Sequence, residues 1–554
     1  MSQSNKSQTQ IINEHPILLG FVVRQKIADG SVRIKVRWKR LTSACIALFA
    51  TAWLGMAGAL YLHFKYQKDF DTVSYVNMIT LPFRLDAHRV QMGNYHIQRG
   101  IEAIKEEEFR DGFRLLRLGV ARSPANLEGR RLVAEFYEVA LNRPDIAIEL
   151  LIAGLDHGGD SDLQYLSRTL SLLLHHQMDN KVRDLAIQLL PELVEITDIN
   201  KTIAYAAANA NHLRGNYDAA DDYLNDYQLL NSLEGVLLSA QISWDRGNQL
   251  AAVEKLELTQ RKYPNSDPLL MQLIRYYRER GDLDQARRYA ILRNINNPLS
   301  YAPRVELLYI HEKAGDQERV NQEIDLILQL FNDNLKALQA LANFAADTGN
   351  IEVSRKTYEK ALENEFNIAE FALLLIEAHL VSGDFSGGLK FADELIKERP
   401  EWLSDHLAVF GSLRSIASYA LDRPDLGDIY LRDFITDSSN KAETYVAVAR
   451  RFEQVKRPQQ ARQILRAAYE RNPNNQKILT QLLTIELKLG NTENLNELLS
   501  EFLQTRRPPN ELLLSAYKKL ASDRFIFTEG RDELLLQISS MLRENGKSIL
   551  DLDS

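Results

Sequence analysis

Few residues in this sequence suit disulfide, metal or redox chemistry. Cys45 is the one cysteine among 554 residues, so the chain can form no internal disulfide and no zinc site with several Cys ligands. The eleven histidines are scattered, and the adjacent His175 and His176 would point to different sides of a helix. Neither a phosphate-binding glycine loop nor a His-Glu-x-x-His motif occurs. The sequence therefore predicts no metal, no cofactor, no catalytic residues and no enzymatic activity.

Long uncharged runs are also scarce, and one stands out. Residues 42–62 contain no charged side chain, and about 20 apolar residues suffice for a helix that crosses a bilayer. We therefore expect a single-pass transmembrane signal-anchor helix there. A buried core helix is the alternative, whereas a cleaved signal peptide fits poorly because 41 residues precede the run.

Basic residues are concentrated before this run and sparse after it. Residues 1–41 carry eight Lys or Arg and two acidic residues, whereas only Lys65 and Lys68 follow closely, beside Asp69 and Asp71. The positive-inside rule then predicts a cytoplasmic N-terminus and a periplasmic remainder, in a bacterial inner membrane. Because the whole chain has a formal charge of −8, the part after residue 41 is acidic, which argues against nucleic acid as a partner.

The basic tail, residues 1–41, contains a strand-like pattern. From Val32 to Lys39 apolar and basic residues alternate strictly, which predicts a strand with one apolar and one basic face. Asp29-Gly30 can form a hairpin turn that pairs this strand with residues 21–27. Such a hairpin would lie on anionic lipid or dock a cytoplasmic partner. The alternative is a loose tail whose charges only set the topology.

Small residues recur every four positions within the uncharged run. Such a ridge lets two membrane helices pack closely, which predicts a homodimer or a contact with a membrane partner through the transmembrane helix. An Ala-rich segment produces such ridges by chance as well. The ridge consists of Ser43, Ala47, Thr51, Gly55 and Ala59.

Glycine is sparse but regularly placed. Five glycines recur at a spacing of 34 residues, and Asn or Asp follows each of them. A period of 34 is the length of a helix–turn–helix unit that stacks into a solenoid. The five are Gly247, Gly281, Gly315, Gly349 and Gly383.

Each glycine ends an apolar segment with helical periodicity. Gly281 suits the left-handed position that follows a helix end, and Asp282 can cap the next helix. Ala252 and Ala286 are small residues in one register, which allow two helices to approach closely. These marks together predict pairs of helices.

The pattern resembles the tetratricopeptide repeat (TPR). Pro264 and Pro298 repeat in the same register. When Pro298 is set at the family's proline position, Tyr277 takes its aromatic position and Ala286 its small one. The resemblance covers roughly residues 90–545 and implies an all-α, right-handed solenoid of TPR-like helix pairs, preceded here by the transmembrane helix.

The remaining boundaries follow from breaks in this pattern. Leu81-Pro82-Phe83 should end or bend a helix that leaves the membrane, and the repeat register slips near Leu421–Leu426. We expect a stalk or hinge over 63–90, TPR-like repeats over 91–402 that are most regular over 233–402, an irregular repeat with an insertion over 403–441, and further repeats with capping helices over 442–554.

In the TPR family the first helix of each pair lines a concave groove that binds a peptide or helix. The family's clamp for chaperone C-termini needs a Lys–Asn pair that these repeats lack, so that ligand is excluded. Aromatic residues and Arg dominate interface energies. Trp244 also has an alternative role in packing between repeats. The resemblance assigns to the groove Gln241, Trp244, Arg275, Arg278, Tyr309, Asn343 and Glu377.

The resemblance implies protein binding as the function. We expect a membrane-anchored scaffold in a bacterial envelope assembly such as secretion, polysaccharide export or cell-wall machinery. One alternative is a chaperone-like module that binds clients in the periplasm. Another is a membrane-tethered adaptor that faces the cytoplasm.

Overall fold

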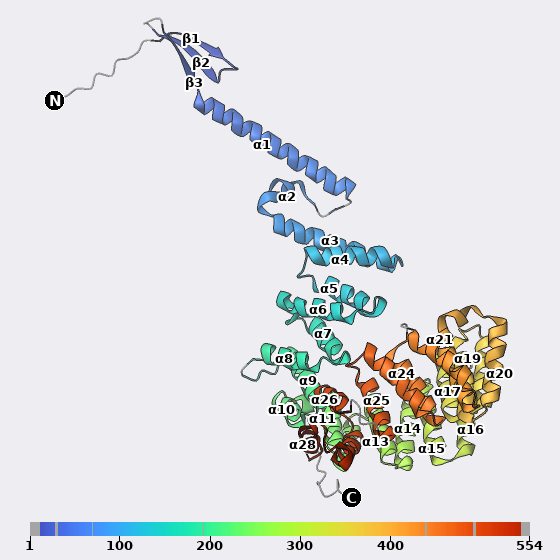
Figure 1. The fold of residues 1–554 in the computed structure, drawn as a ribbon. Helices are drawn as coiled ribbons and strands as arrows, with labels where there is room; N and C mark the ends of the chain where they lie inside the picture. Colours follow the sequence, from blue (N-terminus) through green and yellow to red (C-terminus); the bar gives the residue numbers. More distant parts are fainter. Residues whose placement is uncertain are drawn as a thin grey trace. The chain divides into compact units, whose positions relative to one another are not determined.

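The computed structural model describes residues 11–27, 31–68, 70–71, 73–191, 193–437, 440–490 and 495–543. They belong to two compact units, Met1–Leu172 and Leu173–Ser554, and Figure 1 labels most of their helices and strands.

The first unit begins with a three-stranded antiparallel sheet in the order β1-β2-β3. Its strands are β1 Ile11–Ile17, β2 Val22–Ile27 and β3 Val32–Val36. The pairing of β2 with β3 agrees with the expected hairpin, while its Asp29-Gly30 turn lies outside the described residues. Strand β1 was not predicted.

The two faces of this sheet are mixed rather than separately apolar and basic. Ile34 lies opposite Arg24, and Lys35 lies opposite Val23, so the alternation of β3 is offset from that of its neighbour. Val23 is 1% exposed whereas Ile34 is 71% exposed. The predicted alternation of apolar and basic residues belongs to β3, whereas each face of the sheet contains residues of both kinds.

A long helix follows the sheet. Helix α1 spans Trp38–Leu62 and continues as the π-helical turn η1 His63–Gln67. Among the described residues, this is one helix long and apolar enough to cross a membrane, and only 6% of its most apolar window is buried. It contains the predicted run 42–62 and extends beyond it at both ends.

The segment expected to be a stalk packs back against α1. Helix α2 Tyr75–Ile79 precedes the 3₁₀ turn η2 Leu81–Phe83 and helix α3 Leu85–Lys105. Trp53 donates a hydrogen bond to the carbonyl of Ile79 at 2.9 Å, and Tyr75 donates to the carbonyl of Leu54 at 3.0 Å. The helix that continues α1 ends at Gln67, well before Pro82, so this proline shapes the turn between α2 and α3 instead.

Antiparallel helices complete the first unit. Their periodic apolar residues pack pairwise, with Ile97 and Leu116 at the buried contact between α3 and α4. The elements are α4 Phe109–Arg122, α5 Leu127–Glu135, η3 Phe136–Ala140, α6 Pro144–Gly154, η4 Leu155–Gly159 and α7 Leu163–His175, whose last residues enter the second unit.

The second unit is a succession of helix pairs (Figure 1). The helices with odd numbers from α9 onward are the first helices of their pairs. The elements are α8 Asp179–Leu189, α9 Asp198–Leu213, α10 Tyr217–Asp226, η5 Leu229–Asn231, α11 Leu233–Asp245, α12 Gln249–Lys262, α13 Asp267–Glu279, α14 Leu283–Asn296, α15 Ala302–Ala314, α16 Gln317–Leu330, α17 Leu335–Thr348, α18 Ile351–Glu363, α19 Ala369–Ser382, α20 Phe385–Glu398, η6 Glu401–His406, α21 Leu407–Ala420, α22 Pro424–Thr436, α23 Ala442–Gln454, α24 Pro458–Arg471, α25 Gln476–Leu489, α26 Leu495–Gln504, α27 Asn510–Ala521, η7 Asp523–Phe525 and α28 Arg531–Arg543.

The periodic glycines lie where the sequence predicts them, in the turn inside each pair. All five have positive φ, from 71° to 89°, which L-residues with a side chain adopt only under strain. The next residue caps the second helix in most pairs. Asp282 accepts a hydrogen bond from the backbone N–H of Gln285 at 3.1 Å, and Asp316, Asn350 and Asp384 make the equivalent bond. Asn248 makes no such cap.

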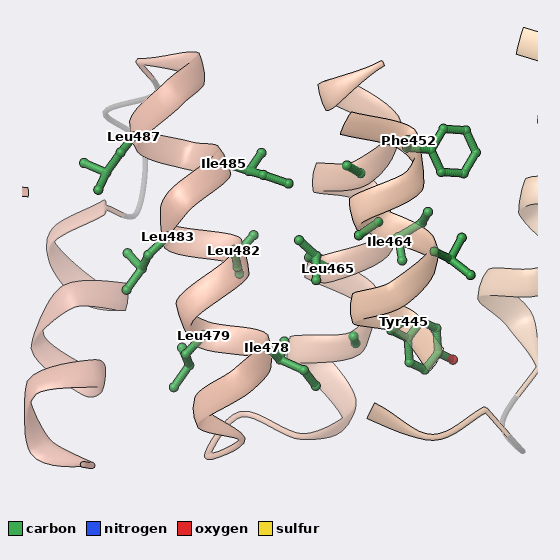
Figure 2. Packing of buried hydrophobic residues seen from close by; sticks show 14 of the residues in the cluster. Tyr445, Phe452, Ile464, Leu465, Ile478, Leu479, Leu482, Leu483, Ile485 and Leu487 are labelled. Atoms are coloured by element: carbon green, nitrogen blue, oxygen red, sulfur yellow. The ribbon is translucent and has the colours of Figure 1, made fainter. Parts of the chain in front are cut away.

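Successive pairs share one apolar interior. Figure 2 shows helix α25 with Leu479, Leu483 and Leu487 on one side and Ile478, Leu482 and Ile485 on the other. All six are buried, so α25 packs against the preceding pair and the following helix at once. A first helix with two apolar faces is what lets each pair stack on its neighbours.

The irregular repeat is displaced at a different point from the one predicted. A period of 34 from Ala369 would start the next first helix at residue 403, whereas α21 starts at Leu407. The 3₁₀ turn η6 occupies the extra residues. The turn between α21 and α22 has ordinary length, so the insertion precedes α21 and does not fall near Leu421–Leu426.

Two glycines allow a matched test of this repeat geometry. A Cβ on Gly281 would meet no atom within 4 Å, whereas a Cβ on Gly349 would lie 2.8 Å from the backbone nitrogen of Ser382 in the next pair. Gly281→Ala should therefore cost about 1 kcal/mol through backbone strain alone. Gly349→Ala should cost about 2–3 kcal/mol because overpacking adds to that strain. Urea unfolding followed by circular dichroism measures both, and equal shifts of the midpoint would contradict this account.

Candidate functional site

The first helices α11 to α19 carry the residues that the sequence assigns to a groove. Gln241 and Trp244 of α11 are half-buried and line a cavity described below. The indole of Trp244 stacks on the phenol ring of Tyr276 in the next pair, with centroids 3.8 Å apart and planes within 8°. Trp244 thus has one face committed to packing between repeats, as the alternative interpretation proposed, and still borders the cavity.

Arg275 and Arg278 of α13 differ in how closely other residues of the chain engage their side chains. Arg275 is half-exposed, lies over the ring of Tyr276, and approaches Glu279 at 3.9 Å. Arg278 lies 3.6 Å from Glu306 of the next pair. Arg275 is therefore the freer of the two to contact a partner.

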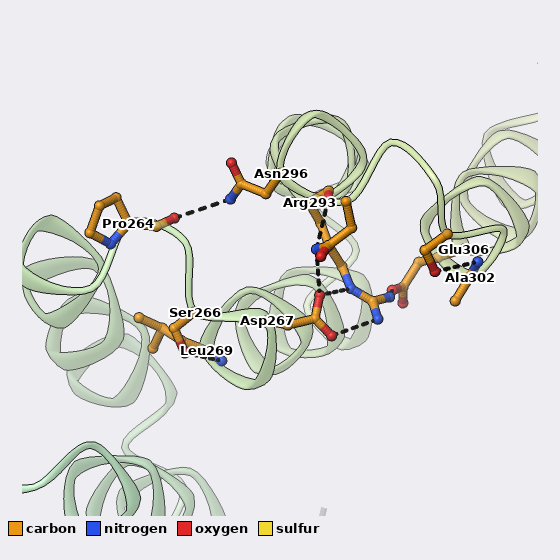
Figure 3. Close-up of polar contacts among 10 residues, drawn as sticks. Pro264, Ser266, Asp267, Leu269, Arg293, Asn296, Ala302 and Glu306 are labelled. Atoms are coloured by element: carbon orange, nitrogen blue, oxygen red, sulfur yellow. Dashed lines mark hydrogen bonds and ion pairs between the residues drawn. The ribbon is translucent and has the colours of Figure 1, made fainter.

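Glu306 belongs to a polar network that fixes three helices (Figure 3). Arg293 of α14 is 7% exposed, and its guanidinium binds both carboxylate oxygens of Asp267 at 2.6 and 2.9 Å and Glu306 at 3.0 Å. Burial raises the pKa of Glu306, although Arg293 and Arg278 oppose that rise. Removing one member of such a buried set leaves the others unpaired, so we assign the network to holding α13, α14 and α15 in register.

Tyr309 and Glu377 are connected across the inner surface, by which we mean the surface formed by the first helices of the pairs. The hydroxyl of Tyr309 donates to Asp347 of α17 at 2.9 Å. Burial is the main cause that raises the pKa of Tyr309, and the negative charge of Asp347 raises it further. Arg451 of α23 lies 3.4 Å from Asp347 and 2.8 Å from Glu377. Residues on four first helices thus form one chain of contacts, which requires the arc of pairs to curve tightly here.

Asn343 stands outside this chain. Its side chain is exposed and donates to the carbonyl of Gln339 one turn earlier in the same helix. The structure therefore groups Gln241 with Trp244, and Tyr309 with Glu377. It leaves Arg275 exposed between the two groups, and Asn343 exposed on the helix between Tyr309 and Glu377.

The far end of the second unit returns to its beginning (Figure 1). Arg506, in the loop between α26 and α27, binds Asp179 of α8 through two nitrogens, at 2.8 and 2.7 Å, and also donates to the carbonyl of Leu174. The side chain of Asp179 is 1% exposed and that of Arg506 is 16% exposed. This bidentate pair joins residues 327 positions apart.

Contacts to backbone carbonyls accompany the Arg506–Asp179 pair. The backbone N–H of Arg507 donates to the carbonyl of Leu213 at 2.9 Å, and the guanidinium of Arg214 donates to the carbonyl of Gln504 at 2.9 Å. Gly215, with φ of 83°, leaves room for the Arg507 side chain, since a Cβ there would lie 2.8 Å from its Cδ. The loop is therefore seated closely on the turn between α9 and α10.

Two cavities flank this junction. Cavity A, about 1160 Å³, lies between the end of α7 with the start of α8 and the α24–α25 turn, with Gln504, Thr505 and Arg506 in its wall. Cavity B, about 700 Å³, lies between Gln241 and Trp244 of α11 and Gln476 and Thr480 of α25. Arg506 and Lys477 line both. The predicted groove residues at α11 thus form one wall of a cavity whose other wall comes from the last repeats.

Several residues of this site could not be found from the sequence. Asp179, Asp347, Arg451, Arg506 and Arg507 show no motif, and their partners lie in distant repeats. The sequence offered one signal, which concerns the repeat register. Arg507 falls 34 residues after Pro473, at the position where the repeat pattern has proline. Within the described residues, no group of three or more His, Cys, Asp or Glu could hold a metal ion.

Comparison with protein-family models and with curated proteins found no match. Among solved structures, a tetratricopeptide repeat protein from Parabacteroides merdae is 17% identical with a TM-score of 0.28, and the match covers 46% of this chain and 98% of that one. A structure of Naa15/Naa10 bound to HypK-THB is 14% identical with a TM-score of 0.28, covering 89% of this chain and 80% of that one. Similarity this low supports no conclusion about function, and the assignment of TPR-like helix pairs rests on the helix bounds and the glycine turns.

Proposed function

We propose that this protein is a scaffold that binds partner proteins on the inner surface of its second unit. The observation that carries the proposal is the surface of the first helices, on which half-buried Trp244 borders cavity B and Arg275 is exposed one pair further along. Trp244 and Arg275 present the residue types that most often anchor protein interfaces. A peptide or a helix is the occupant that such a surface accepts in related architectures.

The proposal places the scaffold at a bacterial inner membrane through α1. The apolar part of this helix is largely exposed in the chain, and lipid would cover it. Basic residues of β3 and of the start of α1 precede the apolar part, which favours a cytoplasmic N-terminus and a periplasmic second unit. A membrane-tethered adaptor with the opposite orientation is the alternative that a topology experiment separates.

The small-residue ridge of α1 is available for contact in this arrangement. Ser43, Ala47, Thr51, Gly55 and Ala59 are all exposed, and a Cβ on Gly55 would meet nothing within 4 Å. Helix α2 packs instead near Trp53, Leu54 and Ala57. We propose that the ridge mediates association with a second copy or with another membrane helix.

Participation in an envelope assembly is the wider role we infer, with secretion, polysaccharide export and cell-wall synthesis as candidates. It follows from combining the proposed location with the proposed binding surface. A chaperone-like module that captures many clients would use the same surface, so the number of partners distinguishes the two roles.

Photo-crosslinking in cells tests the binding surface. A photoreactive residue replaces Arg275 on α13, and the matched control carries it at Ile295 of α14, which is 66% exposed on the second helix of the same pair. We expect one or two defined adducts from position 275 and none from position 295. A broad smear from position 275 would favour the chaperone-like role, and equal adducts from both positions would contradict a specific surface.

The orientation is tested by reporter fusions after Ser554. Alkaline phosphatase, which matures only in the periplasm, should be active there, and a fluorescent protein that folds in the cytoplasm should be dark when exported unfolded through the same route. The reverse pattern would establish the cytoplasm-facing adaptor instead.

The ridge is tested by Gly55→Leu. The larger side chain should separate two closely packed helices and reduce self-association of α1 in a membrane two-hybrid assay by at least fivefold. Ile46→Ala, at an exposed position on the side of the helix opposite Gly55, is the control and should leave the signal unchanged. Association that survives Gly55→Leu would exclude the ridge as a contact surface.

A further inference from the structure

The return of the last repeats to the first helices of the second unit follows from local packing. Arg451 of α23 reaches both Glu377 of α19 and Asp347 of α17, so the inner surface is narrow enough for a side chain to cross several pairs. An arc of this curvature brings the loop after α26 back to α8 without any separate linker. Whether the second unit closes then depends on the contacts between the loop after α26 and helix α8.

We propose that Arg506 and Asp179 form a clasp that closes the helix pairs of the second unit into a ring, and that cavity A exists only while the clasp is shut. The clasp would set the shape of the second unit even when no partner is bound. It assigns to one loop, Thr505 to Pro509, control over whether the inner surface is an open arc or a closed ring.

The chemistry of the pair suits this role. Both nitrogens of the guanidinium edge meet both oxygens of the carboxylate, which is the strongest geometry for such a pair. The Asp179 side chain is almost fully buried, so without Arg506 it would be a carboxylate held away from water and lacking its cation. Separating a buried pair is costly for this reason, and the closed state is favoured as long as both partners are present.

The clasp also builds the wall of cavity A. Gln177 and Asn180 come from the beginning of the unit, whereas Asn475 and Gln504 come from its last repeats. One contact joins the two ends directly, because the backbone N–H of Gln476 donates to the side-chain oxygen of Gln177 at 3.4 Å. A segment seated in cavity A would touch both ends at once, so it would bind the closed ring better than the open arc and shift the equilibrium toward closure.

Disulfide trapping tests the clasp without any knowledge of a partner. In the full-length protein with Cys45→Ser, cysteines replace Gln177 and Gln476, the positions in contact across the closure. Oxidised glutathione is added, and the rate of intramolecular disulfide formation is followed by gel mobility. The variants are Asp179→Arg, Arg506→Asp, and both together, with Lys488→Glu as a control that disrupts the exposed Lys488–Glu453 pair.

Each charge reversal alone should slow disulfide formation at least tenfold, because like charges would meet at the clasp. The double reversal should be faster than either single variant by at least threefold, since opposite charges face each other again, and Lys488→Glu should match the parent. Helical circular dichroism confirms that each variant is folded. Unchanged rates in the single variants, or a double variant no faster than the slower single one while helicity is intact, would overturn the clasp. Neither result depends on the crosslinking experiment at position 275, so the two proposals fail separately.

Discussion

The structure depends on one constraint: a first helix with two apolar faces must be covered on both. Helix α25 shows it, with buried leucines and isoleucines on opposite sides (Figure 2). No single helix pair can satisfy this requirement alone, so pairs stack in sequence and the interior grows along the chain. The turn inside each pair must then be short and reproducible. Glycine at positive φ with a capping Asp or Asn supplies that turn, and this is why the period is visible in the sequence.

Stacking also brings polar residues of different repeats into contact with one another. Arg293 ties together neighbouring helices, as Figure 3 shows, whereas Arg451 reaches across several pairs. The same geometry carried further brings Arg506 to Asp179. Register within the arc, curvature of the arc and closure of its ends thus rest on Arg–carboxylate contacts of increasing sequence separation. The two cavities are consequences of that closure, and the proposed binding surface inherits its shape from it.

The sequence predicts the local part of this design and misses the distant part. Gly247 and its four counterparts, the caps after four of the five glycines and the hairpin between β2 and β3 were accessible because turn geometry is fixed by neighbouring residues. Strand β1 lacks alternation, with Asn, Glu, His and Pro in its middle, so no periodicity announced it. The short helix α2 was hidden because its apolar residues pack on α1 rather than on a repeat. The insertion before α21 was misplaced because η6 has no repeat signature.

Arg506 and Asp179 could not be paired at all, since nothing local records a contact over such a separation. For the same reason, the sequence could not show that three of the predicted groove residues, Tyr309, Arg278 and Glu377, contact other residues of the chain.

The closure of the second unit in solution is the claim on which this account depends most, and a distance measurement between its two ends tests it directly. Spin labels are attached to cysteines that replace Asn180 and Gln504, which face cavity A from opposite ends of the arc, in the Cys45→Ser protein with the clasp intact. Double electron–electron resonance then reports the distribution of distances between them. The account predicts a single narrow distribution at short distance. A broad distribution that extends to long distances would show that the helix pairs form an open arc and would contradict the ring.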